Sequence, residues 1–136
     1  MVYLIYGNQS IRIKAQLKAI VKKNLADADD LNYVKYDFLQ TPIREIMDDV
    51  SYLPLGYDHK IVVIENCSFI SKERFKDRNN EPDDYDELNQ FIQSKDETID
   101  LILLLPTSSI NKKNATYSLI EANGKIIYIE DPDLKC

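Results

Sequence analysis

The apolar residues of this chain fall into short runs that are typical of β-strands, and the segments between them carry apolar residues at helical spacing. The run Leu101–Leu105, which Pro106 closes, is apolar throughout and predicts the most buried strand. The predicted strands span residues 2–6, 33–38, 60–64, 101–105 and 125–129. Because helical segments separate them, we predict a single α/β domain over residues 1–136. It is expected to have three layers in the order αβα, with a mostly parallel five-stranded sheet in the middle.

The first two predicted helices each have one apolar face. The first begins at Gln9 or Ser10, after the break at Gly7. The second begins at Thr41 and Pro42, with the hydroxyl of Thr41 as the predicted cap and Pro42 in the first helical position. The inward faces are Ile13, Leu17, Ile20 and Val21 in the first helix, and Ile43, Ile46, Met47 and Val50 in the second.

The second half of the chain predicts two shorter helices and one segment without apolar periodicity. Residues 87–92 form the third predicted helix. The fourth runs from about residue 114 to residue 123, with Gly124 at the position after its C-cap. Residues 71–86 are charged and lack periodicity, so we expect a mobile loop that the fold does not require.

Composition narrows the classes of function. With 136 residues and 44% hydrophobic content, the chain can build one core, and its formal net charge of −6 argues against nucleic-acid binding through the overall field. A local basic patch remains open, because the first helix carries basic residues that either contact phosphates or face solvent. These basic residues are Arg12, Lys14, Lys18, Lys22 and Lys23.

The location of the protein is also constrained by its sequence. No apolar run approaches the roughly 20 residues that cross a membrane, and the first residues resemble no signal peptide. Cys67 and Cys136 are expected to be reduced thiols, and His59, as the only histidine, excludes the usual zinc sites. We therefore expect a soluble, cytoplasmic protein with no membrane partner.

The turn after the first predicted strand is where an open parallel sheet would bind a nucleotide, but it lacks a complete phosphate loop. The motif G-x-x-x-x-G-K-[ST] needs its second glycine and its lysine, because backbone N–H groups and the ammonium group contact the phosphates. Arg12 stands where that glycine would fall, and no Gly-Lys pair follows. The remaining candidate positions are Gly7, Asn8, Gln9 and Ser10.

Other catalytic arrangements are equally incomplete. Glu65 is a single acid after the third predicted strand, which is a weak signal for a magnesium site. No nucleophile–base–acid set can be built around His59. The sequence therefore gives no support to an enzyme, and we expect no metal and no cofactor.

The connector before the third predicted strand has an unusual composition. Leu53, Leu55 and Tyr57 are bulky and apolar, but Pro54 and Gly56 prevent a regular helix or strand that would bury them. Such residues either cap the core or project outward to bind a partner. Taken alone, the stretch leaves both interpretations open.

Four stretches together resemble the N-terminal domain of the bacterial DNA polymerase III delta subunit. Each is degenerate alone, and the specificity lies in their shared order along nearly the entire chain. They are V-Y-L-I-Y-G-N-Q-S-I-R-I-K from Val2, L-P-L-G-Y-D-H-K-I-V-V-I-E-N-C-S-F-I from Leu53, I-D-L-I-L-L-L-P from Ile99, and I-N-K-K-N-A-T-Y-S-L-I-E-A-N-G-K-I-I-Y-I-E from Ile110.

The resemblance implies a P-loop NTPase fold of the AAA+ type whose phosphate loop has degenerated. In that family a small helical domain and a collar domain follow the first domain, and both would be absent from this chain. The resemblance further implies a non-catalytic clamp-loader subunit that binds and opens the DNA sliding clamp, the beta subunit, during DNA replication. It would act within the DNA polymerase III holoenzyme, a nucleotidyltransferase, beside other clamp-loader subunits, and would contact DNA only through the assembled complex.

The same resemblance implies where the clamp would bind. The family's apolar pair, which enters a hydrophobic pocket on the clamp, falls on Pro54 and Leu55, with Leu53 and Tyr57 beside it. The commoner family pattern has aromatic residues at the positions of Leu55 and Gly56, so this chain departs from the pattern at the wedge itself. Two other functions stay open: an active nucleotide-binding domain with an unusual phosphate loop, and a general interaction domain of AAA+ ancestry.

Overall fold

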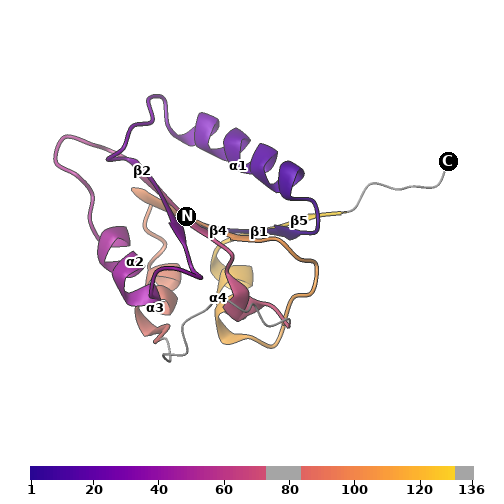
Figure 1. Ribbon diagram of the computed structural model, residues 1–136. Helices are drawn as coiled ribbons and strands as arrows, with labels where there is room; N and C mark the ends of the chain where they lie inside the picture. Colours follow the sequence, from indigo (N-terminus) through magenta and orange to yellow (C-terminus); the bar gives the residue numbers. More distant parts are fainter. Residues whose placement is uncertain (73–83, 131–136) are drawn as a thin grey trace.

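The computed structural model describes residues 1–72 and 84–130, which fold into three layers (Figure 1). A parallel sheet forms the middle layer, with α1 on one face and α2, α3 and α4 on the other (Figure 1). Its strands lie in the order β2-β3-β4-β1-β5. The strands are β1 (Val2–Gly7), β2 (Tyr33–Asp37), β3 (Lys60–Glu65), β4 (Ile99–Leu105) and β5 (Lys125–Ile129). The helices are α1 (Ser10–Asn24), α2 (Ile43–Val50), α3 (Asp86–Ser94) and α4 (Ala115–Asn123), with a 3-10 turn, η1 (Ser68–Ile70), after β3.

Strand β4 lies at the centre of the sheet, and all of its residues are buried, as the apolar run predicted. Because side chains alternate between the faces of a strand, the run supplies both halves of the core. Leu101 and Leu103 pack in the cluster under α2, α3 and α4, whereas Ile102 and Leu104 pack in the cluster under α1. The predicted α/β class, the parallel sheet and the five strands are therefore confirmed.

Helix α1 also agrees with its predicted pattern. It begins at Ser10 with Gln9 as its N-cap, and Ile13, Leu17 and Ile20 are buried against the sheet. The basic residues of α1 are exposed and lie on the surface away from this core. This arrangement agrees with the interpretation that the basic residues of α1 face solvent.

The start of α2 differs from the prediction by one residue. Pro42, not Thr41, is the N-cap, and the helix begins at Ile43. Pro42 keeps an extended ψ of 145°, yet its carbonyl already accepts a hydrogen bond from the backbone N–H of Ile46 at 3.3 Å. The backbone N–H of Thr41 instead donates to the carbonyl of Asp37 at 2.9 Å, which places Thr41 in the turn that leaves β2.

The ends of α4 also show why sequence signals can mislead by one residue. Asn114, predicted as the first residue, is the N-cap, and its side-chain oxygen accepts hydrogen bonds from the N–H groups of Thr116 and Tyr117. Gly124 is the C-cap itself, and its φ of −123° is not left-handed. Glycine is required there because a Cβ atom would lie 2.3 Å from the carbonyl oxygen of Val2.

The predicted mobile loop at 71–86 lies for the most part outside the described residues, which omit 73–83. Its described ends are ordered parts of the fold. Ser71 forms an antiparallel bridge with Ile110, and Asp86 is the first residue of α3. The mobility of the segment between them stays a prediction.

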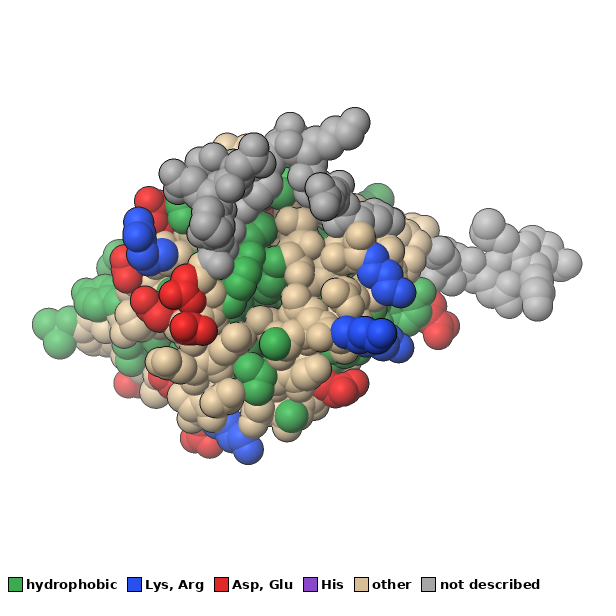
Figure 2. Space-filling view, turned by 90° about the horizontal axis from the view of Figure 1, so that it is seen from below, with side chains coloured by type: hydrophobic (Ala, Val, Ile, Leu, Met, Phe, Trp, Pro, Cys, Tyr) green, Lys and Arg blue, Asp and Glu red, His purple; other side chains and the backbone are tan. Residues whose placement is uncertain are grey.

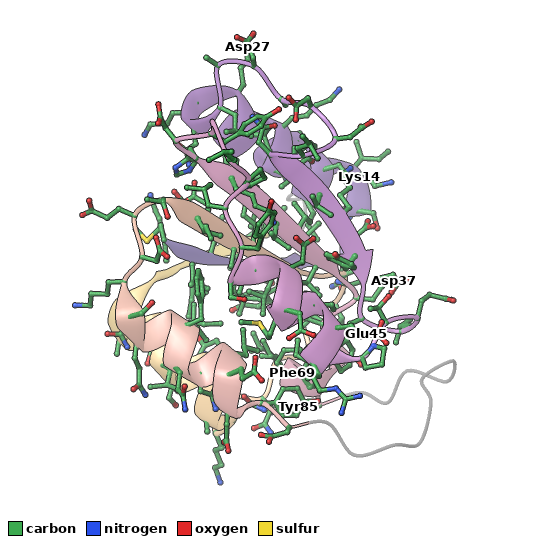
Figure 3. All side chains as sticks on the ribbon, turned by 90° about the vertical axis from the view of Figure 1, so that its left-hand side faces the viewer. Lys14, Asp27, Asp37, Glu45, Phe69 and Tyr85 are labelled. Carbon is green, nitrogen blue, oxygen red and sulfur yellow. The ribbon has the colours of Figure 1, made fainter. Side chains whose placement is uncertain are left out.

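Because all strands run in the same direction, the sheet has one edge where the strands begin and one edge where they end, which Figure 3 shows from the side. Asp27, in the connection from α1 to β2, marks the amino edge, where the strands begin. Asp37, the last residue of β2, marks the carboxyl edge. The remnant of the phosphate loop lies at the carboxyl edge, whereas the connector that contains Leu55 lies at the amino edge.

Candidate functional site: the tip between α2 and β3

Residues 51–59 join α2 to β3 and form a projecting connector, which we call the tip. It lies beside the connection between α1 and β2, because β2 and β3 are neighbouring parallel strands. The backbone N–H of Ile61 donates to the carbonyl of Asn32 at 2.8 Å, and the hydroxyl of Tyr57 donates to Asp29 Oδ2 at 2.6 Å. This second hydrogen bond raises the pKa of Tyr57 and lowers that of Asp29.

A tight turn forms the end of the tip. The backbone N–H of Tyr57 donates to the carbonyl of Pro54 at 3.1 Å, which closes a four-residue turn with Leu55 and Gly56 in its centre. Gly56 has a φ of +89°, whereas Leu55 is not among the residues with positive φ, and this combination is typical of a type II turn. A Cβ atom at Gly56 would meet no other atom within 4 Å, so the backbone angle, not space, is the reason for glycine there.

The turn separates the four predicted site residues by exposure. Leu55 is 98% exposed at the apex, whereas Pro54 is buried and Leu53 and Tyr57 are half-buried. The predicted apolar pair is therefore not displayed as a pair, because only Leu55 faces outward. Pro54 is buried, whereas Leu55 projects outward, which is one of the two arrangements expected for this stretch.

Two further exposed apolar residues, one in the tip and one in the neighbouring connection, were not singled out from the sequence. Tyr52 precedes the predicted stretch, and Leu31 belongs to the neighbouring connection from α1 to β2. Neither shows a local signal, because a single apolar residue in a loop is common on protein surfaces. Only the pairing of β2 with β3 brings their two connections together.

A buried lysine, whose role the sequence did not indicate, supports the tip from beneath. Lys60 begins β3 and is only 1% exposed. Its ammonium group donates to Asp49 Oδ1 at 2.5 Å, to the carbonyl of Asp49 at 2.8 Å and to the carbonyl of Tyr52 at 2.8 Å. The ammonium group reaches these two carbonyls because it lies at the C-terminal end of α2, where a helix has free carbonyl groups and a partial negative charge.

Asp49 receives a second donor from the sheet. The hydroxyl of Tyr36 in β2 donates to Asp49 Oδ2 at 2.5 Å. Burial works to raise the pKa of Asp49, but the hydrogen bonds from Lys60 and Tyr36 outweigh it, and the pKa lies below its ordinary value. Burial, followed by the bond to Asp49, raises the pKa of Tyr36 to about 12. The tip is thus fixed by hydrogen bonds to α2, to the sheet and to the α1–β2 connection.

His59, the only histidine of the chain, belongs to a small polar cluster at the base of the tip. Its Nε2 atom lies 2.8 Å from Asp100 Oδ2, and Asp100 is buried. The amide of Asn24 donates to the same oxygen at 2.8 Å. These contacts join the tip to the ends of α1 and β4, which gives the cluster a supporting role.

The remnant of the phosphate loop has lost the geometry for phosphate binding. Ile13 occupies the position of the P-loop lysine, and it is 3% exposed and packs in the core under α1. Asn8 exchanges two hydrogen bonds with Ser108, each of 3.0 Å. Gly7 is held close to β5, where a Cβ atom would lie 2.4 Å from the carbonyl oxygen of Ile129. Gln9 and Ser10 are simply the N-cap and first residue of α1.

A hollow of about 220 Å³ remains at the carboxyl edge next to this loop. The acid Glu65 and the cation Lys14 both line it, so its charged groups offset one another. In the described part of the chain, no three acidic, histidine or cysteine side chains are grouped closely enough to hold a metal ion. Over the same residues, no helix is both long and apolar enough to span a membrane.

Comparison with known families decides the relationship that the sequence suggested. Residues 3–130 match the family described as DNA polymerase III, delta subunit. The chain belongs to the DNA polymerase III delta subunit family. No match was found among curated protein sequences.

Two solved structures share the fold of this chain. The clamp loader delta protein of Bacillus subtilis superimposes with a TM-score of 0.84 at 18% identity, over 96% of this chain and 38% of that protein. A DNA polymerase III gamma subunit-related protein of Thermotoga maritima superimposes with a TM-score of 0.58 at 14% identity, over 98% of this chain and 42% of that protein. The chain thus spans about two fifths of the length of these structures, and its fold is that of clamp-loader AAA+-like domains.

Proposed function

We propose that this delta-family domain binds the DNA sliding clamp through the tip, with Leu55 as the side chain that enters an apolar pocket on the clamp. The observation that carries the proposal is the 98% exposure of Leu55 at the apex of a turn whose flanking residues are held by hydrogen bonds. A leucine in that position stabilises nothing within the described part of the domain, whereas it is well placed to be buried by a partner.

The supports of the tip favour binding because they reduce its cost. A flexible loop loses conformational entropy when it docks, and that loss weakens binding. Here Lys60, Tyr57 and the type II turn already hold the backbone in one conformation. The domain therefore presents Leu55 in a preorganised form, as binding hot spots usually require.

In the same proposal the domain is not catalytic and takes no nucleotide of its own. The buried Ile13 at the P-loop lysine position supports this view and argues against the alternative of an active nucleotide-binding domain. Opening of the clamp would then draw its energy from ATP bound by other clamp-loader subunits of a cytoplasmic assembly.

A site-directed crosslink tests where the clamp binds. A photoreactive phenylalanine derivative replaces Leu55 in one preparation and Ile11 in the other. Ile11 is a suitable control because it is also apolar and 83% exposed, but lies on α1 at the opposite edge of the domain. We expect irradiation to crosslink the Leu55 preparation to the purified sliding clamp and the Ile11 preparation to give none. Crosslinking from Ile11 alone would contradict the proposed interface.

A further inference from the structure

A second pocket lies at the carboxyl edge, far along the sheet from the tip. It has a volume of about 730 Å³ and is formed by the ends of β1 and β5 together with the segment before α4. Three lysines and two tyrosines line it beside Ser108, Ser109, Ile110 and Asn111. We call it the lysine–tyrosine pocket, after the five lining residues Tyr6, Lys72, Lys112, Lys113 and Tyr128.

The two tyrosines form one aromatic platform. Tyr6 and Tyr128 are directly opposite each other in the pairing of β1 with β5, and their rings stack with centroids 4.9 Å apart at an angle of 28°. Tyr6 is buried beneath, whereas Tyr128 is 45% exposed. An exposed ring backed by a second ring is a rigid surface for stacking another flat aromatic group.

The lysines converge from segments that are distant in sequence. The backbone N–H of Lys72 donates to the carbonyl of Ser109 at 2.9 Å, and that of Asn111 donates to the carbonyl of Ile70 at 2.8 Å. These bonds hold Lys72 beside the loop that carries Lys112 and Lys113. None of the three ammonium groups forms an ion pair with a described residue, and no carboxylate lines the pocket in the described part of the chain.

The local charge of the pocket is opposite in sign to that of the whole chain. The formal net charge is −6, yet the charged lining residues of the pocket are all cationic. On the face that carries α2, α3 and α4, basic side chains are visible on the right-hand side of Figure 2, the side toward which β5 runs in Figure 1. A local basic patch of this kind attracts anions although the overall field repels them.

We propose that the lysine–tyrosine pocket binds single-stranded nucleic acid, with one unpaired base stacked on Tyr128 and the backbone phosphates beside Lys72, Lys112 and Lys113. Stacking on aromatic side chains together with cationic contacts to the backbone is the usual chemistry of single-strand binding. Several unpaired cations spread over two segments suit a chain of phosphates better than one free nucleotide. The proposal does not depend on the function of the tip, because the two surfaces lie at opposite edges of the sheet.

Fluorescence anisotropy with the 136-residue chain and a labelled oligothymidylate of about 12 nucleotides tests this proposal. Each phosphate that the protein neutralises contributes about −0.7 to the slope of log K against log salt concentration for a single strand. We expect a slope of about −2 for three lysines, and a loss of about 1.4 from its magnitude in the variant Lys112→Ala/Lys113→Ala. The matched control Lys18→Ala/Lys22→Ala removes the same charge from α1 and should leave the slope unchanged.

A second pair of variants tests the stacking. Tyr128→Leu should weaken binding by roughly fivefold or more, whereas Tyr128→Phe, which keeps the ring, should bind within about twofold of the original chain. Thermal unfolding of both variants is the check that they are folded. A duplex of the same length and free thymidine monophosphate serve as competitors of the labelled strand. Four results would overturn the proposal: no binding of the strand, equal loss of slope in both lysine variants, competition by the duplex as strong as by the unlabelled strand, or equally strong competition by thymidine monophosphate at the same nucleotide concentration.

Discussion

Lys60 and Asp49 form an ion pair beneath the tip, with 2.5 Å between Nζ and Oδ1, although the side chain of Lys60 is almost completely buried. Removing the lysine would leave a carboxylate and two carbonyls without their shared donor. We therefore expect Lys60→Met to lower the free energy of unfolding by about 3 kcal/mol, as for a broken buried pair. Urea unfolding measures this loss against Lys18→Met, which replaces an exposed lysine. A loss below about 1 kcal/mol would mean that Lys60 does not support the tip.

The two partners of Asp49 also predict how stability depends on pH. The folded-state pKa of Asp49 is lowered, so its contribution is present above the unfolded value of about 3.9 and is lost as the pH falls through the folded value. The pKa of Tyr36 is raised to about 12, so its contribution is present below about pH 10 and is lost as the pH rises toward 12. Asp49→Asn should flatten the acid side of the unfolding profile, and Tyr36→Phe the alkaline side. Unchanged profiles would contradict this network.

The type II turn predicts a specific cost at Gly56. Its φ of +89° is unfavourable for a residue with a Cβ atom, although space is available there. We expect Gly56→Ala to destabilise the domain by about 1 kcal/mol and Gly56→Asn by less, because asparagine tolerates positive φ better. Denaturant unfolding of both variants measures the difference. Equal stability of Gly56→Ala and the original chain would show that the turn has another conformation in solution.

The degenerate phosphate loop predicts that ATP does not bind. Ile13 offers no charge to a phosphate, and Asn8 is already bonded to Ser108. Calorimetric titration with Mg-ATP should therefore give no heat of binding at micromolar concentrations. A micromolar dissociation constant would revive the alternative of an active nucleotide-binding domain.

Much of the fold was predictable because the signals are long and redundant. The run from Leu101 to Leu105 has the length and the closing proline that are typical of a buried strand, and the spacing of Ile13, Leu17 and Ile20 is typical of one helical face. Helix ends were less predictable, since they depend on single backbone angles. Gly124 illustrates this limit: it was expected as a residue beyond the C-cap but is required by the close approach of Val2.

The candidate site was predictable in position but not in detail. Pro54 and Gly56 marked an irregular apolar connector, yet only tertiary structure shows that Pro54 is buried and Leu55 exposed. Lys60 was missed because a lysine at the start of an apolar strand normally marks an exposed boundary. Its burial depends on Asp49, which lies on a different element and has no distinctive spacing from Lys60.

The central claim is that Leu55 is an anchor for the sliding clamp and not a part of the core. The most direct measurement pairs unfolding stability with the kinetics of binding to an immobilised clamp for Leu55→Ala, with Ile11→Ala as the control. We expect Leu55→Ala to weaken clamp binding by about 2 kcal/mol or more while it changes the stability of the fold by less than about 1 kcal/mol. Ile11→Ala should change neither quantity. A Leu55→Ala variant that binds the clamp as tightly as the original chain, or that loses the 2–5 kcal/mol of stability typical of a buried leucine, would contradict the account.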